Sequence, residues 1–127
     1  MESLVFLDTH VAIWLYSGEL DLFSKKVLQM INENRICISN MVKLEIKYLN
    51  EIGRVKQKPD TIIDALIDEI GLTFSKNSFE RIVNHAIHLD FTRDPFDRII
   101  VADASINNSY LISKDDVIIK HYKNTIW

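Results

Sequence analysis

Residues 4–16 read LVFLDTHVAIWLY, and this stretch decides the fold. A short apolar run, typical of a strand buried on both faces, is followed by the acid Asp8 and then by a helical segment. The same alternation continues and predicts strands at 3–7, 35–38, 72–74, 110–112 and 125–127, and helices at 10–16, 24–33, 40–53, 60–70, 78–89, 95–107 and 115–121. Strands that alternate with helices pair in parallel, so the expected fold class is α/β, a three-layer sandwich.

Length and composition limit the class of protein. At 127 residues, with 47% apolar and 26% charged residues, the chain is expected to form a single domain over residues 1–127. A net charge of −3 does not indicate nucleic-acid binding by bulk electrostatics, although a local basic rim remains compatible with it. One cysteine, Cys37, excludes an internal disulfide and fits a reducing compartment. Without a membrane-length apolar run or signal-peptide pattern, we expect a cytoplasmic protein and no membrane partner.

Four acids stand beside or within apolar stretches, where an unpaired charge is costly. Asp8 and Asp115 each follow a predicted strand, Glu45 lies in a predicted helix, and Asp97 opens another. The carboxyl ends of parallel strands form the usual ligand-binding edge of an open α/β sheet. Converging carboxylates repel one another unless a cation neutralises them, and Mg²⁺ or Mn²⁺ prefers oxygen ligands. The pattern therefore favours a divalent metal site.

Glu45 is the acid with the clearest placement. At about 100° per residue, the basic and amide side chains of its helix fall on one side and the apolar side chains on the other. Glu45 lies at the centre of the apolar arc, which is formed by Met41, Leu44, Tyr48, Leu49 and Ile52. We therefore expect this arc to be buried with Glu45 at its centre. The alternative is a buried glutamate that is hydrogen-bonded to a strand end or paired with a base.

The other acids each have a structural alternative. Pro95 fits the first helical position and makes Asp94 the N-cap, which leaves Asp97 one turn inside the helix. Asp97 could still serve a capping box, and Asp8 or Asp115 could be helix N-caps. Asp116 competes with Asp115, and the Ser113 hydroxyl could support either. Further along the helix, Asp103 points away from Asp97 and is predicted to lie on the surface or at an interface.

The chain resembles the PIN-domain ribonucleases, and most closely the VapC-type toxins of type II toxin–antitoxin pairs. Residues 7–14, 39–55, 93–102 and 111–115 carry the resemblance, and the stretch Asp-Pro-Phe-Asp-Arg at 94–98 is its most recognisable part. The resemblance implies catalytic and metal-binding roles for Asp8, Glu45, Asp97 and Asp115, and it selects Asp97 over Asp94. Thr9 and Ser113 match positions that often carry a supporting hydroxyl. We assign substrate-binding roles to Thr9, Ser113 and Arg98, with Arg98 as the candidate phosphate contact.

The resemblance also implies a mainly parallel sheet of order 3-2-1-4-5, a homodimer, and a small antitoxin partner. The antitoxin would occlude the site and supply the DNA binding, so the chain itself would contact DNA only indirectly. The sequence departs from the pattern at Phe91-Thr92, where relatives often carry a histidine.

The leading hypothesis is a Mg²⁺- or Mn²⁺-dependent endoribonuclease that hydrolyses RNA with a metal-activated water. The first alternative is an inactive PIN-like binding module whose acids are structural. The second is a metal-dependent phosphatase or DNase on the same architecture, because a fold does not determine a substrate.

Overall fold

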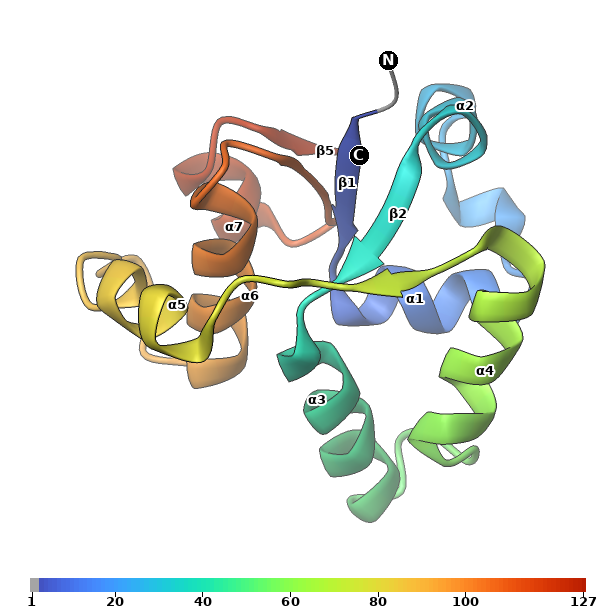
Figure 1. The fold of residues 1–127 in the computed structure, drawn as a ribbon. Helices are drawn as coiled ribbons and strands as arrows, with labels where there is room; N and C mark the ends of the chain where they lie inside the picture. The colour runs from blue at the N-terminus through green and yellow to red at the C-terminus, as the bar shows by residue number, and fades with distance from the viewer. Residues whose placement is uncertain (1–2) are drawn as a thin grey trace.

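Five short parallel strands form the centre of the computed structural model, which describes residues 3–127 (Figure 1). The strands are β1 (Leu4–Leu7), β2 (Arg35–Ile38), β3 (Thr73–Phe74), β4 (Tyr110–Ile112) and β5 (Thr125–Ile126). They lie in the order β3-β2-β1-β4-β5, and all four neighbouring pairs are parallel. The α/β fold and the order 3-2-1-4-5 are therefore confirmed.

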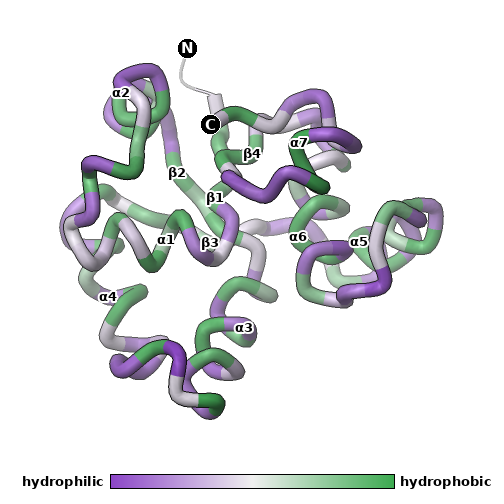
Figure 2. The backbone as a smooth tube through the Cα atoms, turned by 180° about the vertical axis from the view of Figure 1, so that it is seen from behind, coloured by the Kyte–Doolittle hydropathy of each residue, from purple (hydrophilic) through white to green (hydrophobic). Residues whose placement is uncertain are grey.

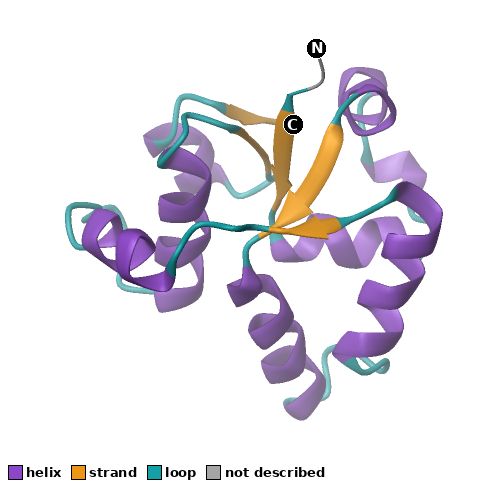
Figure 3. Ribbon diagram, viewed as in Figure 1, coloured by secondary structure: helices purple, strands orange, loops and turns teal. Residues whose placement is uncertain are grey.

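Helices cover both faces of the sheet. They are α1 (Thr9–Tyr16), α2 (Lys25–Glu33), α3 (Asn40–Glu51), α4 (Pro59–Ile70), α5 (Phe79–Ala86), α6 (Pro95–Ser105) and α7 (Asp116–His121), with a short 3₁₀ turn η1 (Leu20–Leu22) that the sequence did not predict. Figures 1 and 3 show α1, α2 and α4 on one side and α5, α6 and α7 on the other. Helix α3 lies beyond the carboxyl ends of β1 and β2. None of the helices within residues 3–127 is long and apolar enough to cross a membrane.

Local signals mark several helix ends, although α3, α5 and α6 end two to three residues earlier than predicted. Ser39 caps α3, because its hydroxyl accepts a hydrogen bond from the Met41 N–H at 3.1 Å. Pro59 and Pro95 occupy first-turn positions of α4 and α6. Helix α4 ends at Gly71, whose φ of 66° is a left-handed conformation that glycine adopts without steric cost.

The core lies between the sheet and the two helical layers. All but the first residues of β1, β2 and β4 are buried, as expected for strands covered on both faces. Figure 2 shows the corresponding apolar colour along β1 and β2. Cys37 lies in this core, and burial raises the pKa of its thiol to about 12. It behaves as the small core hydrophobe that its apolar neighbours indicate.

The predicted burial of the apolar arc of α3 is wrong for three of its five residues, whereas Leu49 is buried and Met41 is partly buried. Leu44, Tyr48 and Ile52 are 56%, 47% and 48% exposed. The helix is anchored instead by Val42 and Ile46, with Leu49, which are the residues of this helix that are buried. Because α3 packs beyond the strand ends rather than flat on the sheet, only one edge of its wide apolar arc meets the core. An apolar stripe is left on the surface.

The prediction that Asp103 lies at the surface is also wrong, because its side chain is 1% exposed. Residues 100–104 of α6 are all buried, since this helix has the sheet on one side and α5 on the other. Oδ1 of Asp103 accepts hydrogen bonds from Ser75 Oγ at 2.6 Å and from Asn77 Nδ2 at 2.8 Å. Within the described residues its Oδ2 has no partner. Asp103 therefore joins α6 to the segment after β3.

Candidate metal centre

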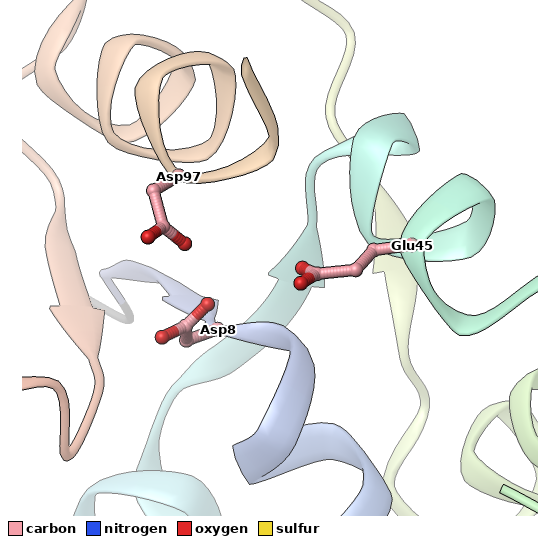
Figure 4. A group of neighbouring side chains, drawn as sticks. All are labelled: Asp8, Glu45 and Asp97. Carbon is pink, nitrogen blue, oxygen red and sulfur yellow. The ribbon is translucent and has the colours of Figure 1, made fainter. Parts of the chain in front are cut away.

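Three carboxylates from three separate elements converge at the carboxyl edge of the sheet. Asp8 follows β1, Glu45 projects from α3, and Asp97 lies in the first turn of α6. One oxygen of each lies within 4.8 Å of the others, and Figure 4 shows all three side chains directed into the same space. The sequence predicted these three residues, and the fold brings them together.

Asp8 is held by contacts with the end of β4 and with the start of α1. Its backbone N–H donates to the Ile112 carbonyl at 3.0 Å, which ties the end of β1 to β4. Its Oδ1 accepts from the Thr9 N–H at 2.8 Å, and its Oδ2 accepts from the Ser113 hydroxyl at 2.6 Å. Burial raises the pKa of Asp8, and these two hydrogen bonds oppose the rise because they stabilise the charged form.

Glu45 is partly buried and is oriented by Thr9. The fully buried Thr9 hydroxyl donates a hydrogen bond to Oε1 of Glu45. Burial raises the pKa of Glu45, and the nearby charge of Asp8 adds to the rise. The hydrogen bond from Thr9 acts in the opposite direction, so Thr9 favours the ionised carboxylate.

Asp97 has its carboxylate available because Asp94 caps the helix. Oδ1 of Asp94 accepts from the N–H groups of Phe96 at 2.8 Å and Asp97 at 3.4 Å, which confirms Asp94 as the N-cap. Burial raises the pKa of Asp97 to about 7, and the charges of Asp8, Asp94, Asp115 and Glu45 contribute. Such mutual repulsion is what a bound cation relieves.

Asp115 lies at the margin of the group. It is exposed and caps α7, where its Oδ1 accepts from the N–H groups of Val117 at 2.9 Å and Ile118 at 3.0 Å. It lines the same cavity as the three converging carboxylates, whereas Asp116 does not. This favours Asp115 over Asp116 as the fourth acid, although one of its oxygens is already occupied by the helix end.

The cavity above the carboxylates has a volume of about 450 Å³. It is lined by Asp8, His10, Val11, Trp14, Glu45, Asp94, Asp97, Lys114 and Asp115. Trp14 and Lys114 were not predicted as site residues, because they are distant in the chain and become neighbours only through the β1–β4 pairing.

The three residues predicted from the sequence to bind substrate do not line this cavity. Thr9 and Ser113 are fully buried and act on the carboxylates of Glu45 and Asp8, which agrees with their role as supporting hydroxyls. Nη2 of Arg98 donates to the Thr92 carbonyl at 2.6 Å, so this guanidinium fixes the loop before α6. The structure therefore gives no support to Arg98 as a phosphate contact.

The donor set fits a hard divalent cation. It consists of carboxylate oxygens, with no histidine or cysteine among the three converging side chains. Mg²⁺ and Mn²⁺ prefer oxygen ligands and complete their shells with water. Burial is the main cause of the raised pKa values of Asp8, Glu45 and Asp97, and the charges of neighbouring carboxylates add to the rise, so a bound cation would stabilise the ionised forms.

Comparison with known proteins gives one family and a set of similar folds. The family model described as PIN domain matches residues 5–124. No curated protein matches the chain by sequence.

Three solved structures have similar folds. VapBC2 from Rickettsia felis, bound to a DNA fragment from its promoter, is 16% identical with a TM-score of 0.68, over 97% of this chain and 96% of that chain. DNA-bound VapBC from Salmonella typhimurium is 15% identical with a TM-score of 0.66, over 98% and 96%. VapBC-1 from nontypeable Haemophilus influenzae is 18% identical with a TM-score of 0.62, over 95% and 91%.

Proposed function

Because the chain belongs to the PIN domain family of nucleases, we propose that it is a metal-dependent endoribonuclease and the toxin of a toxin–antitoxin pair. In this proposal residues 1–127 act as one PIN-like domain. The observation that carries the proposal is the approach of Asp8, Glu45 and Asp97, whose oxygens lie within 4.8 Å of one another. A cluster of this kind, in a cavity of about 450 Å³, offers both a metal site and room for a phosphodiester.

In this mechanism Asp8, Asp97 and Asp115 hold Mg²⁺ or Mn²⁺, directly or through water. Glu45 holds metal or orients the attacking water. When bound, the metal lowers the pKa of a water ligand and stabilises negative charge on the phosphate. Hydrolysis adds the water oxygen to phosphorus and breaks one phosphorus–oxygen bond, and the leaving oxygen takes up a proton.

The supporting residues fix the carboxylates before substrate arrives. Ser113 and the Thr9 N–H hold the two oxygens of Asp8, and the Thr9 hydroxyl holds Oε1 of Glu45. Hydrogen bonds from supporting residues fix the orientation of metal ligands, and so keep the site close to the geometry that the reaction needs.

The proposed partners are an RNA substrate, a small antitoxin and a second copy of the chain, in the cytoplasm. The similarity to VapBC complexes from three bacteria supports the antitoxin. Two of those complexes contain DNA. For the present protein, we propose that the antitoxin makes the contact with DNA. Light scattering of the purified chain tests the homodimer. Co-purification with the product of an adjacent small gene tests the antitoxin.

The decisive experiment is cleavage of total RNA by the purified protein with Mg²⁺ or Mn²⁺, and with EDTA. We expect discrete fragments that require metal and that disappear in Asp8→Asn and Asp97→Asn. The matched control is Asp116→Asn, because Asp116 is an exposed acid that does not line the cavity. Full activity in a folded Asp97→Asn protein would refute the assignment.

Two alternatives predict different results. An inactive binding module gives no cleavage and no heat of Mn²⁺ binding. A phosphatase or DNase binds the metal and cleaves small phosphate esters or DNA, but leaves RNA intact. A panel of these three substrates separates the candidates.

A further inference from the structure

The cavity above the carboxylates has a second wall that the proposed hydrolysis does not use. It is formed by His10, Trp14 and Lys114. Lys114 Nζ lies 5.9 Å from the centroid of the Trp14 ring, and the His10 ring centroid lies 6.0 Å from it. A cation and two aromatic rings therefore stand together beside the acids.

Charge indicates what this wall can bind. Among the residues that line the cavity, five are carboxylates and Lys114 is the one lysine or arginine. A polyanion that approaches these acids is repelled unless positive charge receives it, and a metal ion in the cluster neutralises only part of that charge. Lys114 is exposed, and its flexible stem lets the ammonium group reach a phosphate oxygen at the mouth of the cavity.

Trp14 supplies a rigid aromatic surface at the same place. Its ring packs against Trp127 with 5.7 Å between centroids, and Trp127 packs against the buried Phe23 at 5.2 Å. The ring is therefore supported from behind while it remains partly exposed in the cavity. Aromatic rings beside basic side chains are the usual combination for unpaired bases of nucleic acids.

We propose that Trp14, Lys114 and His10 form a subsite for the nucleotide next to the scissile phosphodiester. Lys114 contacts the phosphate of that nucleotide, its base lies against Trp14, and His10 flanks the ring. The inference rests on the proposed function, because it assumes that RNA reaches the carboxylates. It also specifies the substrate class: the nucleotide must be unpaired, since a base inside a duplex cannot lie against Trp14 without leaving its stack.

Steady-state cleavage of a short single-stranded RNA tests the subsite. We expect Lys114→Gln and Trp14→Leu to raise KM, with Trp14→Phe close to wild type. Loss of one base–aromatic contact corresponds to roughly 5- to 150-fold weaker binding. The matched control is Lys120→Gln, because Lys120 is an exposed lysine on α7 outside the cavity. Thermal unfolding shows whether Trp14→Leu folds, and Lys114→Gln tests the subsite independently of packing.

Fluorescence provides a readout that a structural role of Trp14 would not change. The chain has two tryptophans, so Trp127→Phe leaves Trp14 as the sole emitter. In a Trp127→Phe, Asp97→Asn protein, we expect single-stranded RNA to quench Trp14, and a duplex of the same sequence to quench it much less.

The outcomes separate the two proposals. If the wild type cleaves RNA with metal, but Lys114→Gln and Trp14→Leu keep its KM, the subsite is refuted and the ribonuclease stands. Equal quenching by single-stranded and duplex RNA refutes the requirement for an unpaired base. If the wild type does not cleave RNA, and RNA does not quench Trp14 in the Trp127→Phe, Asp97→Asn protein, both proposals fail.

Discussion

The Thr9 hydroxyl donates a hydrogen bond to Oε1 of Glu45, so the residue that follows one carboxylate of the cluster orients another. The Thr9 backbone N–H also holds Oδ1 of Asp8 at 2.8 Å. One residue at the start of α1 therefore fixes two of the three converging side chains. Because Thr9 is fully buried, this arrangement is part of the fold and does not depend on a ligand.

Replacing Thr9 with Val should weaken metal binding without unfolding the protein. Valine keeps the shape of threonine but loses the hydrogen bond to Glu45, which then no longer has a fixed orientation. Loss of such a supporting contact typically costs about 10- to 100-fold in metal affinity or activity. Mn²⁺ titration calorimetry and RNA cleavage measure the effect. Thr9→Ser should retain most of the affinity, and the exposed Thr61→Val should behave as wild type. Equal Mn²⁺ affinity in Thr9→Val and wild type would contradict the role.

Ser113→Ala should also weaken metal binding, in this case through Asp8. The Ser113 hydroxyl bonds Oδ2 of Asp8 at 2.6 Å and lowers the pKa of Asp8, so its removal favours the protonated acid. We expect weaker Mn²⁺ binding at neutral pH, partly recovered at higher pH, and a loss in stability of about 1 kcal/mol. Calorimetry at two pH values and urea unfolding measure these quantities. Metal affinity that is lost equally at both pH values would argue against an effect through Asp8 protonation.

The metal-free protein should become less stable as pH rises from about 4 to 7. The pKa of Asp97 is raised from 3.8 to about 7 in the folded state, and those of Asp8 and Glu45 are also raised. Between the unfolded and folded pKa values the folded state binds more protons than the unfolded state, so its stability falls as pH increases. Saturating Mn²⁺ should reverse this trend, because metal binding needs ionised carboxylates.

Thermal unfolding between pH 4 and pH 8, with and without Mn²⁺, checks this prediction. Asp97→Asn removes an acid whose pKa is raised to about 7, so its metal-free Tm should depend less on pH. The interpretation fails if the wild type and Asp97→Asn show the same pH slope.

Asp103 should matter for stability and not for catalysis. Its carboxylate accepts hydrogen bonds from the buried Ser75 hydroxyl and the partly buried Asn77 amide, so Asp103→Ala removes the acceptor that these two donors share. We expect a loss of about 1–3 kcal/mol in the free energy of unfolding, and a smaller loss for Asp103→Asn, which keeps an acceptor. Urea unfolding measures the loss, with the exposed Asp64→Asn as control. Cleavage per folded molecule should be unchanged, and its loss in a folded variant would assign Asp103 a role in the site.

Local signals predict the α/β class and most of the acid cluster, whereas the strand order 3-2-1-4-5 was expected only from the resemblance to PIN-domain ribonucleases. Apolar runs followed by helical periods predict the strands and helices, and Asp94 before Pro95 identifies the cap that leaves Asp97 available. Glu45 can be recognised because the sequence of a single helix is enough to show a charged residue at the centre of an apolar arc.

Features that depend on how the elements pack were not predictable. The period of α3 identifies an apolar arc but not which edge of it meets the core, so Leu44 and Tyr48 were wrongly expected to be buried. Asp103 was misplaced because one helix does not reveal that α5 covers the outer side of α6. Lys114 and Trp14 become neighbours only when β4 pairs with β1.

The parallel pairing of β1 with β4 also determines when the cluster can exist during synthesis. Ser113 follows its partner Asp8 by 105 residues, and Asp97 and Asp115 also belong to the last third of the chain. At a translation rate of about 5–20 residues per second, roughly 5–20 s pass between the synthesis of Asp8 and that of β4 and Ser113, which complete its surroundings. A nascent chain therefore carries isolated acids but no assembled centre. If the proposed function holds, the protein would therefore be unable to cleave the RNA around it until Ser113 and Asp115 have been synthesised.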